Sequence, residues 1–140
     1  MTIRAVRNNN PGNIRVGTAW QGLMPRAQMN PDQAAETAFC VFLSPQWGFR
    51  AMATIFHTYA DRDGVTTLRG AISRWAPPTE NNTGAYLQAV CQALSFTPDA
   101  PFPFHDEPHL GALLQAVSIH EVGSWAFSEA DMMAGVETAH

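Results

Sequence analysis

The chain is short of charge and of cysteine. Only 14% of its 140 residues are charged, it has no lysine, and it has just two cysteines, Cys40 and Cys91. Two are too few for a disulfide framework, and each lies in an apolar stretch, so we expect buried free thiols. No apolar run is long enough to span a membrane, and residues 1–8 are too polar for a secretory signal. We therefore expect a protein made in the cytoplasm without a signal peptide or membrane insertion.

The remaining composition is typical of one compact globular domain spanning residues 1–140, since 46% of the residues are hydrophobic and no internal repeat is present. Its charge is unevenly distributed. Eight arginines and four acids before residue 75 give that part a net charge near +4, whereas eight acids and no base give residues 75–140 a charge near −8. The arginines form no dense run and no nucleic-acid motif, so we predict no nucleic-acid partner.

The amino-terminal third is rich in turn residues and predicts little regular structure. Two short segments, Ile14–Val16 and Thr37–Leu43, have the aromatic and β-branched residues typical of strands. A long irregular stretch containing glycine and proline separates them, and such a loop in a small domain is usually functional or mobile. We expect these segments to form a small β-hairpin.

Helical patterns dominate the rest of the chain. Ser44 and Pro45 are typical of a helix start, and apolar residues recur at helical spacing until Asp61–Gly64. Further helices are expected to start at Thr66 or Thr67, at Asn82 or Thr83, before Leu110 and at Ser128. The proline-rich segment Ser95–Pro108 is predicted to be a connecting loop. The expected fold class is mainly α, with about five helices and the small hairpin.

Glu121 is the first candidate for acid chemistry. Leu110, Leu113, Leu114 and Val117 follow helical spacing, the next step on that face is Glu121, and Gly123 is a typical helix stop. Apolar surroundings and the negative end of the helix dipole both disfavour the ionised carboxylate. A general acid in sugar-bond cleavage needs such an environment. The stripe alone favours a surface glutamate at a fraying helix end over an acid in a site.

Metal and thiol chemistry have weak support. A zinc helix beginning at His120 needs a second histidine at position 124, which is Ser124. Pro108 interrupts a second possible group, which we interpret as surface loop residues: His105, Asp106 and His109. Neither cysteine has a neighbouring histidine or a glycine elbow. We therefore expect no metal and no cofactor.

Tryptophans and asparagines give better support for carbohydrate binding. Trp20 lies in a loop next to glycine and polar residues, where its ring is able to stack on a sugar, whereas Trp47 and Trp75 are expected to fill the core. Asparagine amides at positions 8–10 and 13 suit hydroxyl and N-acetyl groups. Asparagines are also ordinary turn formers, and this pattern alone favours a structural role for them.

Taken together, several motifs resemble a family of phage and prophage murein-degrading proteins with a lysozyme-like, lytic-transglycosylase-type fold. The muralytic protein of enveloped double-stranded RNA phages is similar. The resemblance covers roughly residues 4–123, and its specificity lies in the joint occurrence of the motifs in this order. They are RNNNPGNIR at 7–15, WQG at 20–22, FLSPQWGFRA at 42–51 and WAPPTENNTGAY at 75–86.

The resemblance implies a peptidoglycan substrate and one essential glutamate at a helix end beside the cleft. Relatives also have a Glu-Thr-x-x-Tyr-like segment, whose tyrosine approaches the catalytic carboxyl. Residues 80–86 are similar to it, with two residues inserted. That segment usually follows the catalytic glutamate but here precedes Glu121, so we expect a circularly permuted arrangement. Relatives often have the sequence His-Glu-Asn-Gly around the catalytic glutamate, where this chain has His120-Glu121-Val122-Gly123.

The leading hypothesis is therefore cleavage of the β-1,4 bond between N-acetylmuramic acid and N-acetylglucosamine by a lytic transglycosylase or a muramidase. Glu121 is the expected acid, Tyr86 orients the carboxyl or substrate, and Glu80 is a rival acid or second carboxylate. No second carboxylate has an obvious partner spacing, which favours transglycosylation. The residues expected to bind substrate are Asn10, Asn13, Arg15 and Trp20.

Two other functions remain open: a peptidase that cleaves the stem-peptide cross-link, and a non-catalytic wall-binding or virion protein. In each case the expected partner is bacterial peptidoglycan. We expect a monomer that acts on the cell wall from the periplasm or is carried in a virion.

Overall fold

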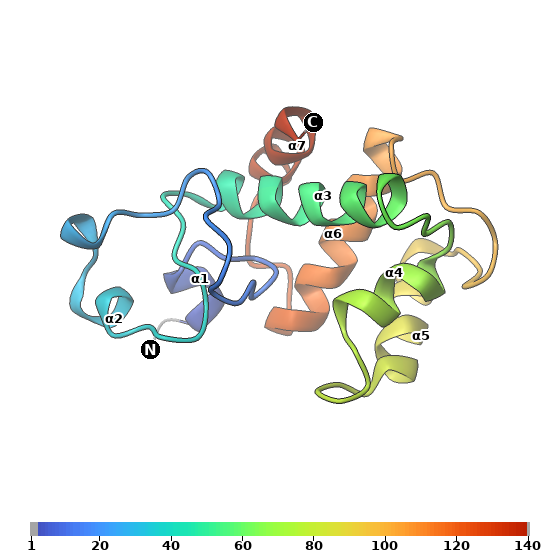
Figure 1. The fold of residues 1–140 in the computed structure, drawn as a ribbon, viewed down its shortest axis with the longest axis horizontal. Coiled ribbons are helices and arrows are strands. Elements are labelled where there is room, and N and C mark those ends of the chain that lie inside the picture. The colour runs from blue at the N-terminus through green and yellow to red at the C-terminus, as the bar shows by residue number, and fades with distance from the viewer. Residues whose placement is uncertain (1–2, 140) are drawn as a thin grey trace.

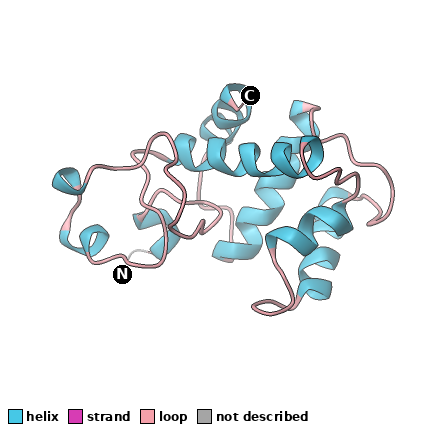
Figure 2. Ribbon diagram, viewed as in Figure 1, coloured by secondary structure: helices cyan, strands magenta, loops and turns pink. Residues whose placement is uncertain are grey.

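The structure, a computed structural model that describes residues 3–139, is mainly helical (Figures 1 and 2). This confirms the predicted helical class. The described residues form seven α-helices and one 3-10 turn, two more helices than expected because two four-residue helices lie in the amino-terminal segment. The elements are α1 (Arg4–Arg7), η1 (Arg26–Gln28), α2 (Pro31–Ala34), α3 (Pro45–Asp61), α4 (Leu68–Trp75), α5 (Thr83–Leu94), α6 (Glu107–Val122) and α7 (Glu129–Thr138).

Helix α3 is the central element of the fold and runs along the long axis of the molecule (Figure 1). Pro45 occupies its first turn, where a missing N–H costs nothing. Phe49, Met52 and Phe56 lie on one face of α3 and are completely buried. Helix α7 packs across α3, and α6 contacts both helices. Residues from Ile14 to Ala139 thereby share one apolar core.

Helices α4 and α5 pack side by side near the carboxyl end of α3, and α5 also packs on α6 (Figure 1). Their starts agree with the predicted caps: the Thr67 side chain accepts a hydrogen bond from Gly70 N–H, and Asn82 accepts one from Ala85 N–H. The predicted extent of the loop at residues 95–108 was wrong at its end. Helix α6 already begins at Glu107, because Asp106 caps it and Pro108 fits its first turn.

The expected amino-terminal hairpin is reduced to isolated antiparallel bridges, Arg15 with Phe39 and Leu23 with Phe42. Residues 14–16 and 37–43 do meet, but residues 3–139 contain no extended strand (Figure 2). The Asn10 side chain explains part of this difference. Its amide N–H groups donate to the carbonyls of Ile14 and Cys40, and its oxygen accepts from Ile14 N–H. A side chain thus takes hydrogen bonds that a regular ladder would make.

Candidate functional site

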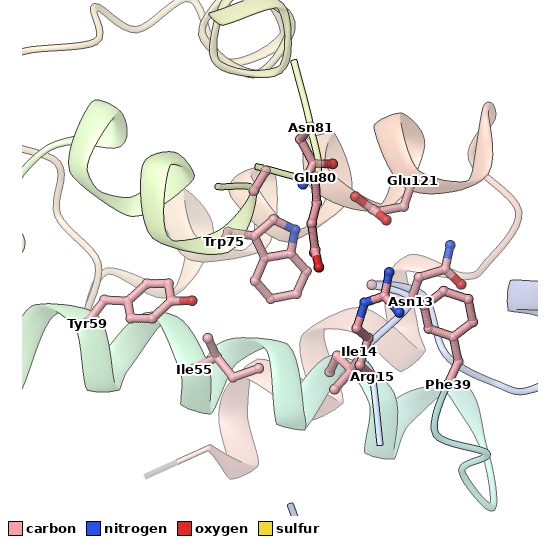
Figure 3. Close-up of a pocket in the computed structure, with 12 residues that line it drawn as sticks. Asn13, Ile14, Arg15, Phe39, Ile55, Tyr59, Trp75, Glu80, Asn81 and Glu121 are labelled. Carbon is pink, nitrogen blue, oxygen red and sulfur yellow. The ribbon is translucent and has the colours of Figure 1, made fainter. Parts of the chain in front are cut away.

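Glu121 lies in the last turn of α6, beside a cleft of about 290 Å³. The predicted face of α6 is confirmed, because Leu110, Leu113 and Val117 are buried and Glu121 is half-buried at the end of that face. Gly123 ends the helix with a φ of 99°, and its N–H donates to the carbonyl of Ile119. The apolar stripe and the glycine stop together bring this carboxylate to the cleft wall (Figure 3).

A chain of hydrogen bonds holds the Glu121 carboxylate. The Tyr86 hydroxyl donates to Glu121 Oε2 over 2.7 Å, and the Trp75 indole N–H donates to the Tyr86 oxygen over 3.1 Å. The ring of His120 lies against the Tyr86 ring with centroids 3.8 Å apart. Three elements, α4, α5 and α6, therefore fix one carboxylate oxygen. The structure thus brings together Tyr86 and Glu121, the pair implied by the family resemblance.

Tyr86 remains a proton donor over a wide pH range. Burial is the main cause that raises the pKa of its phenol, and the nearby Glu121 carboxylate raises it further. Only 2% of Tyr86 is exposed, so solvent does little to support a phenolate. Because the phenol stays neutral, the bond between the two side chains keeps a single direction, from hydroxyl to carboxylate.

Helix α3 and Trp75 form one wall of the cleft. The Trp75 ring stacks on Phe56 with centroids 5.2 Å apart and planes inclined by 19°, while its other parts line the cleft. Ile55 and Tyr59 extend this wall along α3 (Figure 3). Trp75 was expected only to fill core, but it does both, because the stack buries one face and leaves the indole partly accessible.

The facing wall comes from the asparagine-rich turn and the segment that it pairs with. Asn13, Arg15 and Phe39 line it (Figure 3). Asn13 has a φ of 47°, a left-handed conformation that asparagine tolerates better than most residues. Its Oδ1 atom is buried and has no hydrogen-bond donor among residues 3–139. Such an unsatisfied acceptor is costly, so a donor supplied by a bound ligand would be favourable there.

Glu36 anchors this wall from behind and was not anticipated from the sequence. Its side chain is only 1% exposed, and it accepts hydrogen bonds from Arg4, Arg7 and Asn8, at distances of 2.5 to 2.9 Å. The backbone N–H groups of residues 38 and 39 donate to it as well. The hydrogen bonds from Arg4 are the largest cause that holds the pKa of this carboxyl well below its usual range. This network ties α1 to the segment that carries Phe39.

Glu80 is the second carboxylate of the cleft. It is exposed in the turn between α4 and α5, and with Asn81 it lines the cleft with Glu121 (Figure 3). Sequence spacing gave no reason to pair these two acids, because the turn that carries Glu80 is brought over the cleft only by the packing of α4 and α5. The complete lining is Gly12, Asn13, Ile14, Arg15, Phe39, Ile55, Tyr59, Trp75, Ala76, Glu80, Asn81 and Glu121.

Two residues predicted to bind substrate lie elsewhere. Asn10 is completely buried, and its amide is used within the fold, so it shapes the turn that positions Asn13. Trp20 packs partly buried against the core and does not line the cleft. Both misplacements have the same cause: a loop residue that looks exposed in a sequence is buried when the loop folds back on the core.

Sequence reasoning missed several side chains of the cleft, among them Phe39, Ile55, Tyr59 and Asn81. Ile55 and Tyr59 occur at positions i and i+4 of α3, so helical spacing puts them on one face that differs from its fully buried face. The position of these two residues beside the buried face is the one sequence signal that indicates a second, partly exposed apolar stripe on α3. Phe39 and Asn81 carry no comparable local signal.

The two cysteines are free thiols. Cys40 is buried, and burial raises the pKa of its thiol. Burial likewise raises the pKa of the Cys91 thiol, which is half-buried. Within residues 3–139, no group of three or more His, Cys, Asp or Glu side chains is arranged to hold a metal ion.

Comparison with known proteins finds a similarity to a phage protein. Over 91 residues the chain is 38% identical to Protein P5 of Pseudoalteromonas phage PM2, a stretch that covers 62% of this chain and 52% of that relative. The chain thus spans about half the length of the curated relative that it matches. No protein-family profile matches the chain. None of the helices in residues 3–139 has the length and apolar character needed to cross a bilayer. The similarity over these 91 residues is to a protein of a phage.

Proposed function

We propose that this protein is a lytic transglycosylase that cleaves the β-1,4 bond between N-acetylmuramic acid and N-acetylglucosamine in bacterial peptidoglycan. One observation carries the proposal: the half-buried Glu121 carboxylate borders the cleft while Tyr86 holds its Oε2 atom. Its Oε1 atom accepts no hydrogen bond from residues 3–139 and is left for a substrate. A general acid must be oriented by the protein on one side and open to the reacting atom on the other.

The reaction needs one carboxyl group acting twice. Protonated Glu121 first donates its proton to the glycosidic oxygen, the bond from C1 of the muramic residue to that oxygen breaks, and positive charge develops at C1. The N-acetylglucosamine leaves with a free 4-hydroxyl. The Glu121 carboxylate then removes the proton from the 6-hydroxyl of the same muramic residue, and that oxygen bonds to C1. The product is a 1,6-anhydro sugar, no water is consumed, and Glu121 regains its proton.

The walls of the cleft suit an N-acetylated sugar. The accessible part of Trp75 is an apolar aromatic surface of the kind that packs on sugar rings, and its stack on Phe56 keeps it in place. The unpartnered Oδ1 of Asn13 is an acceptor for the N–H of an acetamido group. In this proposal Trp75 takes the stacking role that the sequence suggested for Trp20.

A second candidate reaction is muramidase hydrolysis with two carboxylates. It is favoured by one observation, that Glu80 lines the same cleft as Glu121. In that scheme Glu121 is the acid, and Glu80 activates a water molecule or stabilises the charged sugar. The two reactions give different products from the same substrate.

The wider proposal follows the family resemblance. The lysozyme-like fold is proposed in circularly permuted form, with Tyr86 on α5 preceding Glu121 on α6, and with the bridged segments 14–16 and 37–43 in the place of the small hairpin. The similarity to a phage protein supports a phage or prophage setting. The protein is proposed to be a monomer that meets the cell wall from the periplasm or as part of a virion.

Product analysis tests the proposal. The unaltered protein should release 1,6-anhydro-muropeptides from purified sacculi, and Glu121→Gln should stop this release while the protein still unfolds cooperatively. Glu137→Gln, which changes an exposed acid on α7, is the matched control and should keep full activity. Products with reducing ends, together with loss of activity in Glu80→Gln, would favour the muramidase. Lysis that survives in Glu121→Gln, or new free peptide termini, would overturn the proposal.

A further inference from the structure

Arg15 is an exposed cation without an ion-pair partner in the wall of the cleft. Five arginines are ion-paired to Glu36, Asp63 or Asp99: Arg4, Arg7, Arg62, Arg69 and Arg74. Arg15 forms no salt bridge with any carboxylate of residues 3–139, although it lines the same cleft as Glu80 and Glu121. Its positive charge is therefore not neutralised by the fold.

The Arg15 side chain is held in place without being neutralised. Its guanidinium lies over the Phe39 ring, 5.3 Å from the centroid, and Arg4 approaches the same ring at 4.5 Å. The backbone bridge between Arg15 and Phe39 fixes both residues in register. Phe39 is in turn tied down by its N–H bond to the buried Glu36. A guanidinium stacked in this way loses little further freedom when it binds an anion.

The neighbours of Arg15 narrow the chemistry of that anion. Figure 3 shows the Arg15 guanidinium next to Asn13, on the side of the cleft that faces Glu121. In the proposed sugar site the Oδ1 atom of Asn13 accepts from the acetamido group, whereas the Arg15 guanidinium favours a planar carboxylate. This part of the cleft therefore suits a ligand that carries a carboxylate next to an N-acetylated sugar, which is the chemistry of a sugar bearing an acidic peptide.

A role of Arg15 in substrate binding rests on the proposed function, because Arg15 lines the same cleft as Glu121. In intact peptidoglycan the sugar rings are neutral and the lactyl carboxyl is used in an amide bond, so carboxylates occur on the stem peptide. We propose that Arg15 binds a carboxylate of the stem peptide and thereby selects peptide-bearing glycan. Arg15 is then a specificity residue, and Glu121 remains the acid.

Binding to three forms of peptidoglycan tests this role, with Glu121→Gln as the background so that the substrate is not consumed. The forms are native sacculi, sacculi whose carboxylates have been converted to amides with carbodiimide and ammonia, and glycan that has been stripped of peptide and whose freed lactyl carboxyls have been converted to amides in the same way. We expect Glu121→Gln to bind native sacculi about tenfold more tightly than either other form, a difference of about 1.4 kcal/mol. Adding Arg15→Ala should remove that preference and leave binding to the amidated sacculi unchanged. Adding Arg15→Lys should restore only part of it, because lysine lacks the planar fork.

Arg26→Ala is the matched control. Arg26 is exposed in η1 and lies outside the cleft. Its replacement by alanine removes the same positive charge as Arg15→Ala. It should keep the full preference for native sacculi. The proposal is overturned if Arg26→Ala weakens binding as much as Arg15→Ala, if amidation has no effect, or if stripped glycan binds as well as native sacculi. The binding assay does not depend on cleavage. Inactivity of the unaltered protein would therefore reject the proposed reaction, while the test of Arg15 would still give its own answer.

Discussion

The Tyr86 hydroxyl donates a 2.7 Å hydrogen bond to the Glu121 carboxylate across 35 positions of sequence. The same hydroxyl oxygen accepts the indole N–H of Trp75, which itself forms part of the cleft wall. The orientation of the proposed acid is thus coupled to the position of the aromatic surface that would hold the sugar. A substitution of Tyr86 or Trp75 should therefore change the orientation of the Glu121 carboxylate.

Tyr86→Phe tests this coupling. The change removes the hydrogen bond to the carboxylate that forms when Glu121 gives up its proton, worth about 1.5–3 kcal/mol, and leaves the Trp75 N–H without its acceptor. We expect kcat on sacculi to fall by about 10- to 100-fold while KM changes little, because Tyr86 is buried and acts through Glu121. Steady-state kinetics measures both constants. An unchanged kcat in a protein with an intact near-ultraviolet circular dichroism spectrum would contradict a positioning role.

The two tyrosines of the chain should resist ionisation. Burial is the main cause that raises the pKa of both Tyr59 and Tyr86 above the ordinary value of about 10. Phenolate absorbance should therefore appear at higher pH in the folded protein than in the unfolded chain. In the unfolded chain both phenols ionise at the ordinary value, so their contribution to stability is complete below about pH 10 and is lost as the pH rises further. Spectrophotometric titration beside a urea-unfolded sample checks this; matching curves would contradict it.

The helices from α3 onward were predictable because their signals are local. Pro45 at a helix start, Asn82 as a cap and Gly123 as a stop each act within one or two turns of their own position. The same periodicity put Glu121 on the edge of a buried face. The family resemblance, and no local pattern, joined Glu121 to Tyr86.

The amino-terminal third was not predictable in the same way, because distant side chains hold it. Asn10 connects to Cys40, and Glu36 connects to Arg4 and Arg7, each across about 30 positions. The strand-like pattern near Phe39 does not indicate that side chains make hydrogen bonds that backbone groups would make in a regular pair of strands. The cleft wall that contains Phe39 and Arg15 therefore emerges only in the folded chain.

Glu36→Gln should loosen this third of the protein. The carboxylate is buried between Arg4, whose side chain is 51% exposed, and Arg7, so its loss leaves two cations without their partner. Breaking a buried ion pair costs about 3–5 kcal/mol; with Arg4 half in solvent, we expect a loss of about 2–3 kcal/mol in the free energy of unfolding at neutral pH. Urea unfolding followed by circular dichroism measures it.

The acid dependence of stability gives an independent check on Glu36. Its carboxyl has a lowered pKa in the folded chain, so its contribution to stability is complete above the ordinary pKa of about 4.3 and is lost as the pH falls below it. The unaltered protein should lose stability steeply in this range, whereas Glu36→Gln, which cannot titrate there, should show a shallower decline. Parallel declines would mean that other carboxylates cause the acid sensitivity.

The crossing of α3 and α7 should tolerate little added volume. A Cβ atom at Gly135 would lie 2.7 Å from the Arg50 backbone nitrogen, 2.7 Å from Phe49 Cβ and 2.8 Å from the Gln46 carbonyl oxygen. Two of these three atoms are backbone, so relief requires the helices to move apart. Gly135→Ala should therefore lower the free energy of unfolding by about 1–3 kcal/mol.

Gly84→Ala is the control, because its Cβ would meet only the Asn82 side chain at 3.9 Å. That change should be neutral or add up to about 1 kcal/mol from helix propensity, and equal losses in the two variants would contradict close contact between α3 and α7.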